Sequence, residues 1–117
     1  MHLLGKDVRV TAELPDGSRK PLLWIKDWDF NWQDTYRYKQ PVRLPRGTRV
    51  SARFSFDNSA DNPRNPRRPP KRVTFGEKST DEMAGVALTG FTDREIDQWV
   101  LMMAMMAHYA QIAEKRR

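Results

Sequence analysis

Two side chains that lie far apart in this sequence offer soft metal-binding chemistry: the imidazole of His2 and the thioether of Met83. A ligand set that combines a thioether with an imidazole suits copper, and above all Cu(I), among the biological metals. His2 stands in the segment Met1–Lys6, and Met83 ends the segment Ser79–Met83 at the expected start of a strand. Either residue by itself is as readily explained by packing or by surface exposure, so the pair needs support from its neighbours.

Five blocks of sequence give that support. They are Met1–Lys6, Asp29–Tyr36, Phe56–Pro63, Phe75–Glu77 and Asp81–Met83. In this order and at about this spacing, they resemble the C-terminal domain of the copper type II, ascorbate-dependent monooxygenases. The resemblance is to the bacterial relatives of the peptidylglycine hydroxylating enzyme and dopamine hydroxylase, and it extends from Met1 to about Leu88.

The resemblance implies a particular copper site. In that family the domain holds one copper ion through a His-x-His pair and a methionine. By position, His2 matches the second histidine of the pair and Met83 matches the methionine. The first histidine would fall one residue before Met1, so we expect Met1 to be the middle of a His-Met-His motif in an N-terminally truncated sequence. This copper would bind dioxygen and hydroxylate a C–H bond in the full-length protein.

The resemblance also implies a missing partner. In the family, ascorbate supplies electrons through a second copper, which three histidines of the preceding domain hold. This chain has only His2 and His108, so the second copper needs an N-terminal copper domain or upstream chain, and the chain alone should be inactive. The small apolar segment 84–87 stands where peptide-hydroxylating relatives carry polar side chains that contact the substrate. The resemblance therefore does not identify the substrate. The family suggests an extracytoplasmic location, which the sequence itself leaves unknown.

Other catalytic chemistry has little support in the sequence. The absence of cysteine excludes disulfides, a thiolate metal site and a thiol nucleophile. There is no serine–histidine–aspartate arrangement with a usable histidine, no phosphate-binding loop and no glycine-rich dinucleotide turn. The catalytic residues that remain are the metal ligands themselves.

Alternating polar and apolar residues predict strands over 8–14 and 50–56. Pro15-Asp16-Gly17 predicts a tight turn, after which Arg19–Ile25 returns as the second arm of a hairpin. Alternation of aromatic residues over 28–32 suits a further strand, and short strands are expected over 71–75 and 82–88.

Short strands separated by turns predict an antiparallel sandwich, and the family domain is a jelly roll. The expected fold is therefore mainly β, with a partial antiparallel jelly-roll sandwich over 1–90 and a C-terminal α-helix within 91–117. Because the family's strands before the His-x-His motif are absent here, we expect an open edge and an uncovered inner face.

The predicted helix runs from Asp93 to about Lys115. Thr92 and Glu95 form a capping-box pattern, and apolar residues recur at helical spacing from Ile96 to Ala110. The methionines at 102, 103, 105 and 106 together with His108 could form a second copper site. We favour the interpretation that these methionines fill the core, because flexible methionine side chains pack irregular gaps well. The apolar run Trp99–Ala107 is too short to cross a bilayer.

The net charge of +6 is concentrated in a proline-rich segment that holds Arg64, Arg67, Arg68, Lys71 and Arg72, and at Lys115–Arg117. A basic segment of this kind can bind phosphate backbones. No nucleic-acid motif accompanies it, so we favour a solvated loop, and nucleic acid is not an expected partner. The alternative to a copper protein is a non-catalytic sandwich that uses the methionine-rich helix as a contact face, including contact between identical chains.

Overall fold

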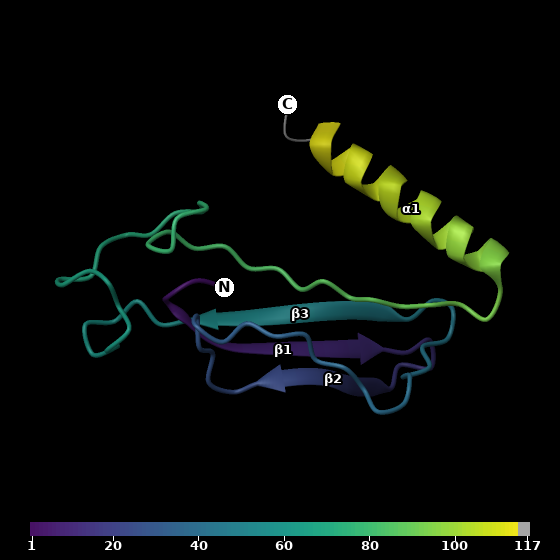
Figure 1. The fold of residues 1–117 in the computed structure, drawn as a ribbon, viewed down its shortest axis with the longest axis horizontal. Helices are drawn as coiled ribbons and strands as arrows, with labels where there is room; N and C mark the ends of the chain where they lie inside the picture. The colour runs from purple at the N-terminus through teal and green to yellow at the C-terminus, as the bar shows by residue number, and fades with distance from the viewer. Residues whose placement is uncertain (115–117) are drawn as a thin grey trace. The chain divides into compact units, whose positions relative to one another are not determined.

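The computed structural model describes the backbone of residues 1–114 and the side chains of residues 1–107. It contains three strands and one helix (Figure 1): β1 Gly5–Glu13, β2 Arg19–Ile25, β3 Arg49–Phe56 and α1 Glu95–Glu114. The chain divides into two compact units, Met1–Val86 and Ala87–Arg117. The first unit holds the sheet and the second holds the helix. A mainly β chain with a C-terminal helix is therefore confirmed.

The sheet is antiparallel and open, with β1 between β2 and β3 (Figure 1). In the register, Val10 of β1 lies opposite Leu23 of β2 and Ala52 of β3. The predicted alternation of β1 is confirmed, since Val8, Val10 and Ala12 are buried. From Val8 onward, even-numbered residues of β1 therefore face the core and odd-numbered residues face the other side, whereas a register shift between Gly5 and Asp7 breaks this alternation at the start of the strand.

Val8, Val10 and Met1 form the core, and partly buried side chains from three segments pack against it. These are Leu22, Leu23, Ile25, Trp28 and Phe54. On the same face, Val50 and Phe56 at the two ends of β3 are 36% and 44% exposed. The core is thus concentrated around the middle of β1 and the start of the chain.

The turn predicted after β1 is confirmed. Gly17 has a φ of +81°, a conformation that glycine adopts without a steric penalty. The main-chain N–H of Leu14 donates to the Ser18 carbonyl at 2.9 Å, and the Ser18 hydroxyl donates to the Asp16 carboxylate at 2.6 Å. The side chain of Asp16 therefore stabilises the hairpin that joins β1 to β2.

Three strand predictions were wrong. Residues 28–32 form a turn, in which the Asp29 side chain accepts a hydrogen bond from the Asn31 N–H at 2.8 Å. A side-chain acceptor of this kind offers the backbone an alternative to a strand ladder. Residues 71–75 and 82–88 form no strands, and the two segments meet in one isolated parallel bridge between Phe75 and Glu82. Within residues 1–114, the structure therefore shows a single three-stranded sheet and no second layer of strands.

The helix begins at Glu95 rather than at the predicted Asp93. The carbonyl of Arg94 accepts hydrogen bonds from the N–H groups of Asp97 and Gln98, so Arg94 is the N-cap. The hydroxyl of Thr92 donates to that same carbonyl at 2.8 Å, so Thr92 does not act as the cap and the predicted capping box is wrong. The predicted cationic end at Lys115–Arg117 and the side chains of His108 and Ala110 lie outside the described residues.

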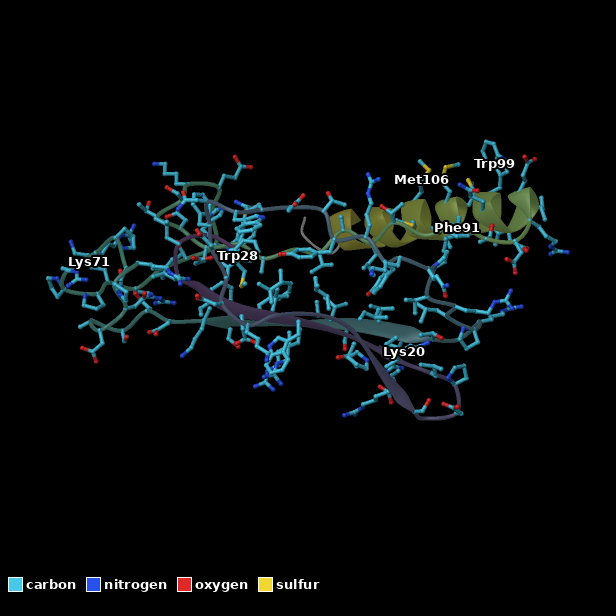
Figure 2. The ribbon with its side chains drawn as sticks, turned by 60° about the horizontal axis from the view of Figure 1, so that its bottom comes forward. Lys20, Trp28, Lys71, Phe91, Trp99 and Met106 are labelled. Carbon is cyan, nitrogen blue, oxygen red and sulfur yellow. The ribbon has the colours of Figure 1, made fainter. Side chains whose placement is uncertain are left out.

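Large apolar side chains on α1 are exposed. Figure 2 shows Trp99 and Met106, which are each 61% exposed, projecting from the same side of the helix. Others on this helix are Ile96, Val100, Leu101, Met102, Met103 and Met105. Among the described residues, no helix is both long enough and apolar enough to span a membrane.

Candidate metal site

The carboxylate of Glu82 holds the start of the chain. Its Oε2 accepts a 2.9 Å hydrogen bond from the main-chain N–H of His2, and its Oε1 accepts a 2.7 Å bond from the N–H of Leu4. An ionised carboxylate accepts several hydrogen bonds, and those that involve a charged partner are the stronger ones. Glu82 therefore anchors the N-terminal segment that carries the first candidate ligand.

The segment that carries Glu82 is itself fixed by backbone contacts. The N–H of Glu82 donates to the Thr74 carbonyl at 3.1 Å, and its carbonyl accepts from the Gly76 N–H at 3.2 Å. Gly76 is required here, because a Cβ at this position would lie 2.9 Å from the Cβ of Asp81. Arg67 adds a weak ion pair with Asp81, in which the nitrogen and oxygen are 4.0 Å apart.

The N-terminal segment is also tied to the sheet. The carbonyl of Leu4 accepts a 2.8 Å hydrogen bond from the N–H of Asp57, directly after β3. The side chains of Met1 and Leu4 are 8% and 3% exposed, so the residues on both sides of His2 are held in the interior. Burial lowers the pKa of the Met1 amino group, an effect that the charge of Glu82 partly offsets.

The imidazole of His2 has a defined orientation. Its Nδ1 lies 3.0 Å from the carbonyl oxygen of Asp81, and the ring meets Phe30 edge-to-face with 5.8 Å between the ring centroids. A carbonyl oxygen only accepts hydrogen bonds, so Nδ1 carries the proton in this contact. The neutral ring then keeps the lone pair on Nε2. This arrangement is the one by which proteins orient a metal-binding histidine, with the second ring nitrogen donating to a carbonyl.

Met83 follows the two residues that His2 contacts. His2 bonds to the Asp81 carbonyl and the Glu82 carboxylate, and the Cα of Met83 lies one peptide unit, about 3.8 Å, beyond that of Glu82. The side chain of Met83 is 37% exposed. The structure thus brings the segments of the two predicted ligands together, with an oriented imidazole on one and a thioether on the other.

Among the side chains that the structure describes, those of residues 1–107, no group of three or more His, Cys, Asp or Glu is placed to hold a metal ion. That search does not cover thioether ligands. The candidate donors are the imidazole nitrogen of His2 and the thioether sulfur of Met83, a soft pair of the kind that suits Cu(I).

Sequence reasoning missed the anchor. Glu82 was noted only as part of a block, although it is the residue that joins the two halves of the site. A carboxylate next to a candidate ligand could have signalled this role, because such groups commonly hydrogen-bond to metal ligands and position them. The contribution of Phe30 was missed as well, since the aromatic alternation there had been interpreted as a strand.

The basic segment predicted to be a solvated loop is partly used for structure. The guanidinium of Arg64 donates to the carbonyl of Trp28 and pairs with Asp27 at 2.6 Å. Arg67 donates to the carbonyl of Arg72 at 3.4 Å. These contacts connect the segment to residues near the end of β2 and to itself.

Comparison with known proteins finds no matching family model, no matching curated protein and no matching solved structure.

Proposed function

We propose that this chain is the copper-binding part of an ascorbate-dependent monooxygenase-like protein, with His2 and Met83 as ligands. The observation that supports it is the 3.0 Å contact between Nδ1 of His2 and the Asp81 carbonyl, which leaves Nε2 available beside the segment that carries Met83. In this proposal the three-stranded sheet is part of a jelly-roll sandwich, as the family resemblance implies.

The residues of the chain have distinct roles in this proposal. Nε2 of His2 and the sulfur of Met83 donate electron pairs to the metal, and the Asp81 carbonyl fixes the tautomer. Glu82 holds the main chain on both sides of the imidazole, and Phe30 limits rotation of the ring. When bound, copper would supply the activation of dioxygen for C–H hydroxylation. The electrons would come from ascorbate through a separate copper domain with three histidines, so the chain alone is inactive.

The test is a competitive Cu(I) titration against a colorimetric chelator. The variant Met83→Leu removes the sulfur and nearly conserves the volume, and His2→Gln removes the imidazole. Met103→Leu on α1 is the matched control, because it also removes one exposed methionine sulfur. We expect both site variants to weaken Cu(I) binding by at least about tenfold. Changes to residues that merely support metal ligands already lower metal affinity by about that factor. Met103→Leu should leave the affinity unchanged.

A chain extended by one histidine before Met1 tests the implied His-Met-His motif directly. If the resemblance is correct, this extension should tighten Cu(I) binding, and Met83→Leu should abolish the gain. Equal affinities for Met83→Leu and the unchanged extended chain would contradict the assignment of Met83. Sustained ascorbate-dependent hydroxylation by the purified chain would contradict the requirement for a second copper domain.

A second candidate function is a non-catalytic interaction module that binds through α1. The observation that favours it is the exposure of large apolar side chains on this helix, among them Trp99 at 61% and Met103 at 60%. Contiguous exposed apolar patches larger than a few hundred Å² are rare on monomers and mark contact sites. The occupant in this candidate is α1 of a second copy of the chain.

A further inference from the structure

The face of the sheet opposite the core carries a cluster of cationic side chains, which we call the cationic face. It consists of Arg9 of β1, Arg19 of β2, Lys26 directly after β2, and Arg49 and Arg53 of β3, together with Trp24 of β2. All six side chains are exposed. Three strands separated in sequence contribute to this face, so it emerges only from the register of the sheet.

The central row of the cationic face places two arginines side by side. Arg9 lies opposite Trp24 on one side and opposite Arg53 on the other. Neighbouring strands are about 4.8 Å apart, and like charges directly opposite each other destabilise a sheet. Asp7 offsets part of the charge, with its carboxylate 3.7 Å from the Arg9 guanidinium. The Arg9–Arg53 pair is therefore a place where a bound anion would relieve repulsion.

Trp24 holds cations at the edge of this row. The Arg9 guanidinium carbon lies 3.9 Å from the centroid of the Trp24 ring, and the Lys26 amino nitrogen lies 4.5 Å from it. Cation–π contacts at these distances are attractive and restrict the side chains. The ring thus preorganises two positive charges on the β2 side of β1, while Arg53 adds a third from β3 on the other side.

A second row lies further along the same face. There Glu13 of β1 is opposite Arg19 of β2 and Arg49 of β3. The two rows are four residues apart on β1, which corresponds to about 14 Å along a strand. Small polar residues, Thr11 and Ser51, occupy the row between them. The five cations of the cationic face outnumber its two carboxylates, those of Asp7 and Glu13.

We propose that the cationic face binds the phosphodiester backbone of single-stranded nucleic acid. Two cationic rows about 14 Å apart fit a ligand that carries several anions along its length. Four of the five cations are arginines, whose planar donor fork matches phosphate oxygens. Sites that follow a single strand without reading its sequence track the phosphate backbone with positive charge, and here Trp24 orients two of those charges. The site is separate from the proposed copper ligands and independent of them.

This site differs from the basic loop that the sequence pointed to. In the loop, Arg64 and Arg67 already pair with Asp27 and Asp81. On the cationic face, by contrast, Arg53 has another arginine as its neighbour across the strands. A membrane surface fits the face less well, because its one large aromatic residue, Trp24, is engaged by two cations and there is no apolar group free to insert.

The experiment measures binding of a fluorescent 15-nucleotide oligo(dT) to the full chain by anisotropy at several salt concentrations. Three phosphate contacts predict a slope of log K against log salt of about −2 for a single strand. Arg9→Gln/Arg53→Gln should weaken binding at least about tenfold and make the slope shallower by about 1. The matched control is Arg68→Gln/Lys71→Gln, which removes the same charge from the exposed basic loop and should change affinity by less than about threefold.

Circular dichroism and thermal melting check that each variant is folded, and Arg19→Gln/Arg49→Gln provides a second pair on the same face. Equal losses in the face and loop variants would show that net charge alone attracts the oligonucleotide, and would overturn the proposal. Absence of binding at 50 mM salt would overturn it as well. So would binding to phosphatidylcholine–phosphatidylserine vesicles without binding to the oligonucleotide.

Discussion

The main-chain N–H of Leu4 donates a 2.7 Å hydrogen bond to Oε1 of Glu82, a residue 78 positions later in the sequence. Leu4 is buried, and its carbonyl in turn accepts a hydrogen bond from Asp57 after β3. Both main-chain polar groups of Leu4 are thus satisfied by distant parts of the chain. The contact joins the N-terminal segment, the end of β3 and the segment before Met83.

Replacement of Glu82 by glutamine should destabilise the sheet-bearing unit by roughly 1–3 kcal/mol, the usual range when a charged acceptor of buried donors is removed. Glutamine retains one acceptor but directs an NH₂ group at the other N–H. The exposed residue Glu77 provides the matched control Glu77→Gln, which should change stability by less than about 0.5 kcal/mol. Urea unfolding measures both. Equal midpoints for the two variants would show that the Glu82 contacts are not important for stability.

Gly5→Ala should destabilise the protein by roughly 1–3 kcal/mol through overpacking. An added Cβ at Gly5 would lie 2.6 Å from Cδ1 of Trp28 and 2.9 Å from Cβ of Met1. The matched control is Gly85→Ala, where nothing lies within 4 Å of the added Cβ. Thermal unfolding compares the two variants. A Gly5→Ala protein as stable as Gly85→Ala would contradict the packing of Trp28 and Met1 around Gly5.

Ser18→Ala should raise the pKa of Asp16. Hydrogen bonds from the Ser18 side chain and N–H lower the pKa of Asp16 below its ordinary value of 3.8. Because the lowered pKa belongs to the folded state, the stabilisation is present above the ordinary pKa and disappears as the pH falls through the lowered value. Ser18→Ala should therefore be less stable than the unchanged protein near pH 7, and the difference should vanish in acid.

NMR titration of the Asp16 carboxyl group measures this change directly. Ser79→Ala is the control, since it removes an exposed hydroxyl far from this turn in the sequence. If the pKa of Asp16 is the same in Ser18→Ala as in Ser79→Ala, the Ser18 side chain does not determine it.

The purified chain should associate reversibly with increasing concentration through α1. Trp99→Ser/Met103→Ser should give soluble monomers with the helix retained, because these substitutions remove two of its most exposed apolar side chains. Gln98→Ser, on the same helix, should leave association unchanged. Sedimentation velocity distinguishes the species. A monomer over a wide concentration range would contradict the contact-face function.

The residue patterns of short stretches of sequence correctly predicted two strands, one turn and the helix. The strands predicted over 8–14 and 50–56, the turn at Gly17 and the helix after Ile96 are all confirmed. The strands and the helix follow from the periodicity of apolar residues, and the turn follows from the conformational freedom of glycine. Both properties can be derived from residue order alone.

Features that depend on which particular hydrogen-bonding group meets which backbone group could not be predicted in this way. The Asp29 side chain closes a turn where aromatic alternation indicated a strand, and Arg94 caps the helix in place of Thr92. The Glu82 anchor connects residues 80 positions apart, a relationship that no periodicity contains. The pairing of His2 with Met83 as metal ligands stays a prediction, supported by the proximity of their segments.

The connection between His2 and Glu82 has a consequence for biosynthesis. A ribosome delivers the N-terminal segment first and Glu82 80 residues later. At about 5–20 residues per second, that interval is roughly 4–16 s. Throughout it the imidazole lacks the carbonyl that orients it, and the amides of residues 2 and 4 lack their acceptor. The site that we propose for His2 and Met83 can therefore form only after residue 83 has been synthesised, and the orientation of the imidazole depends on that later segment.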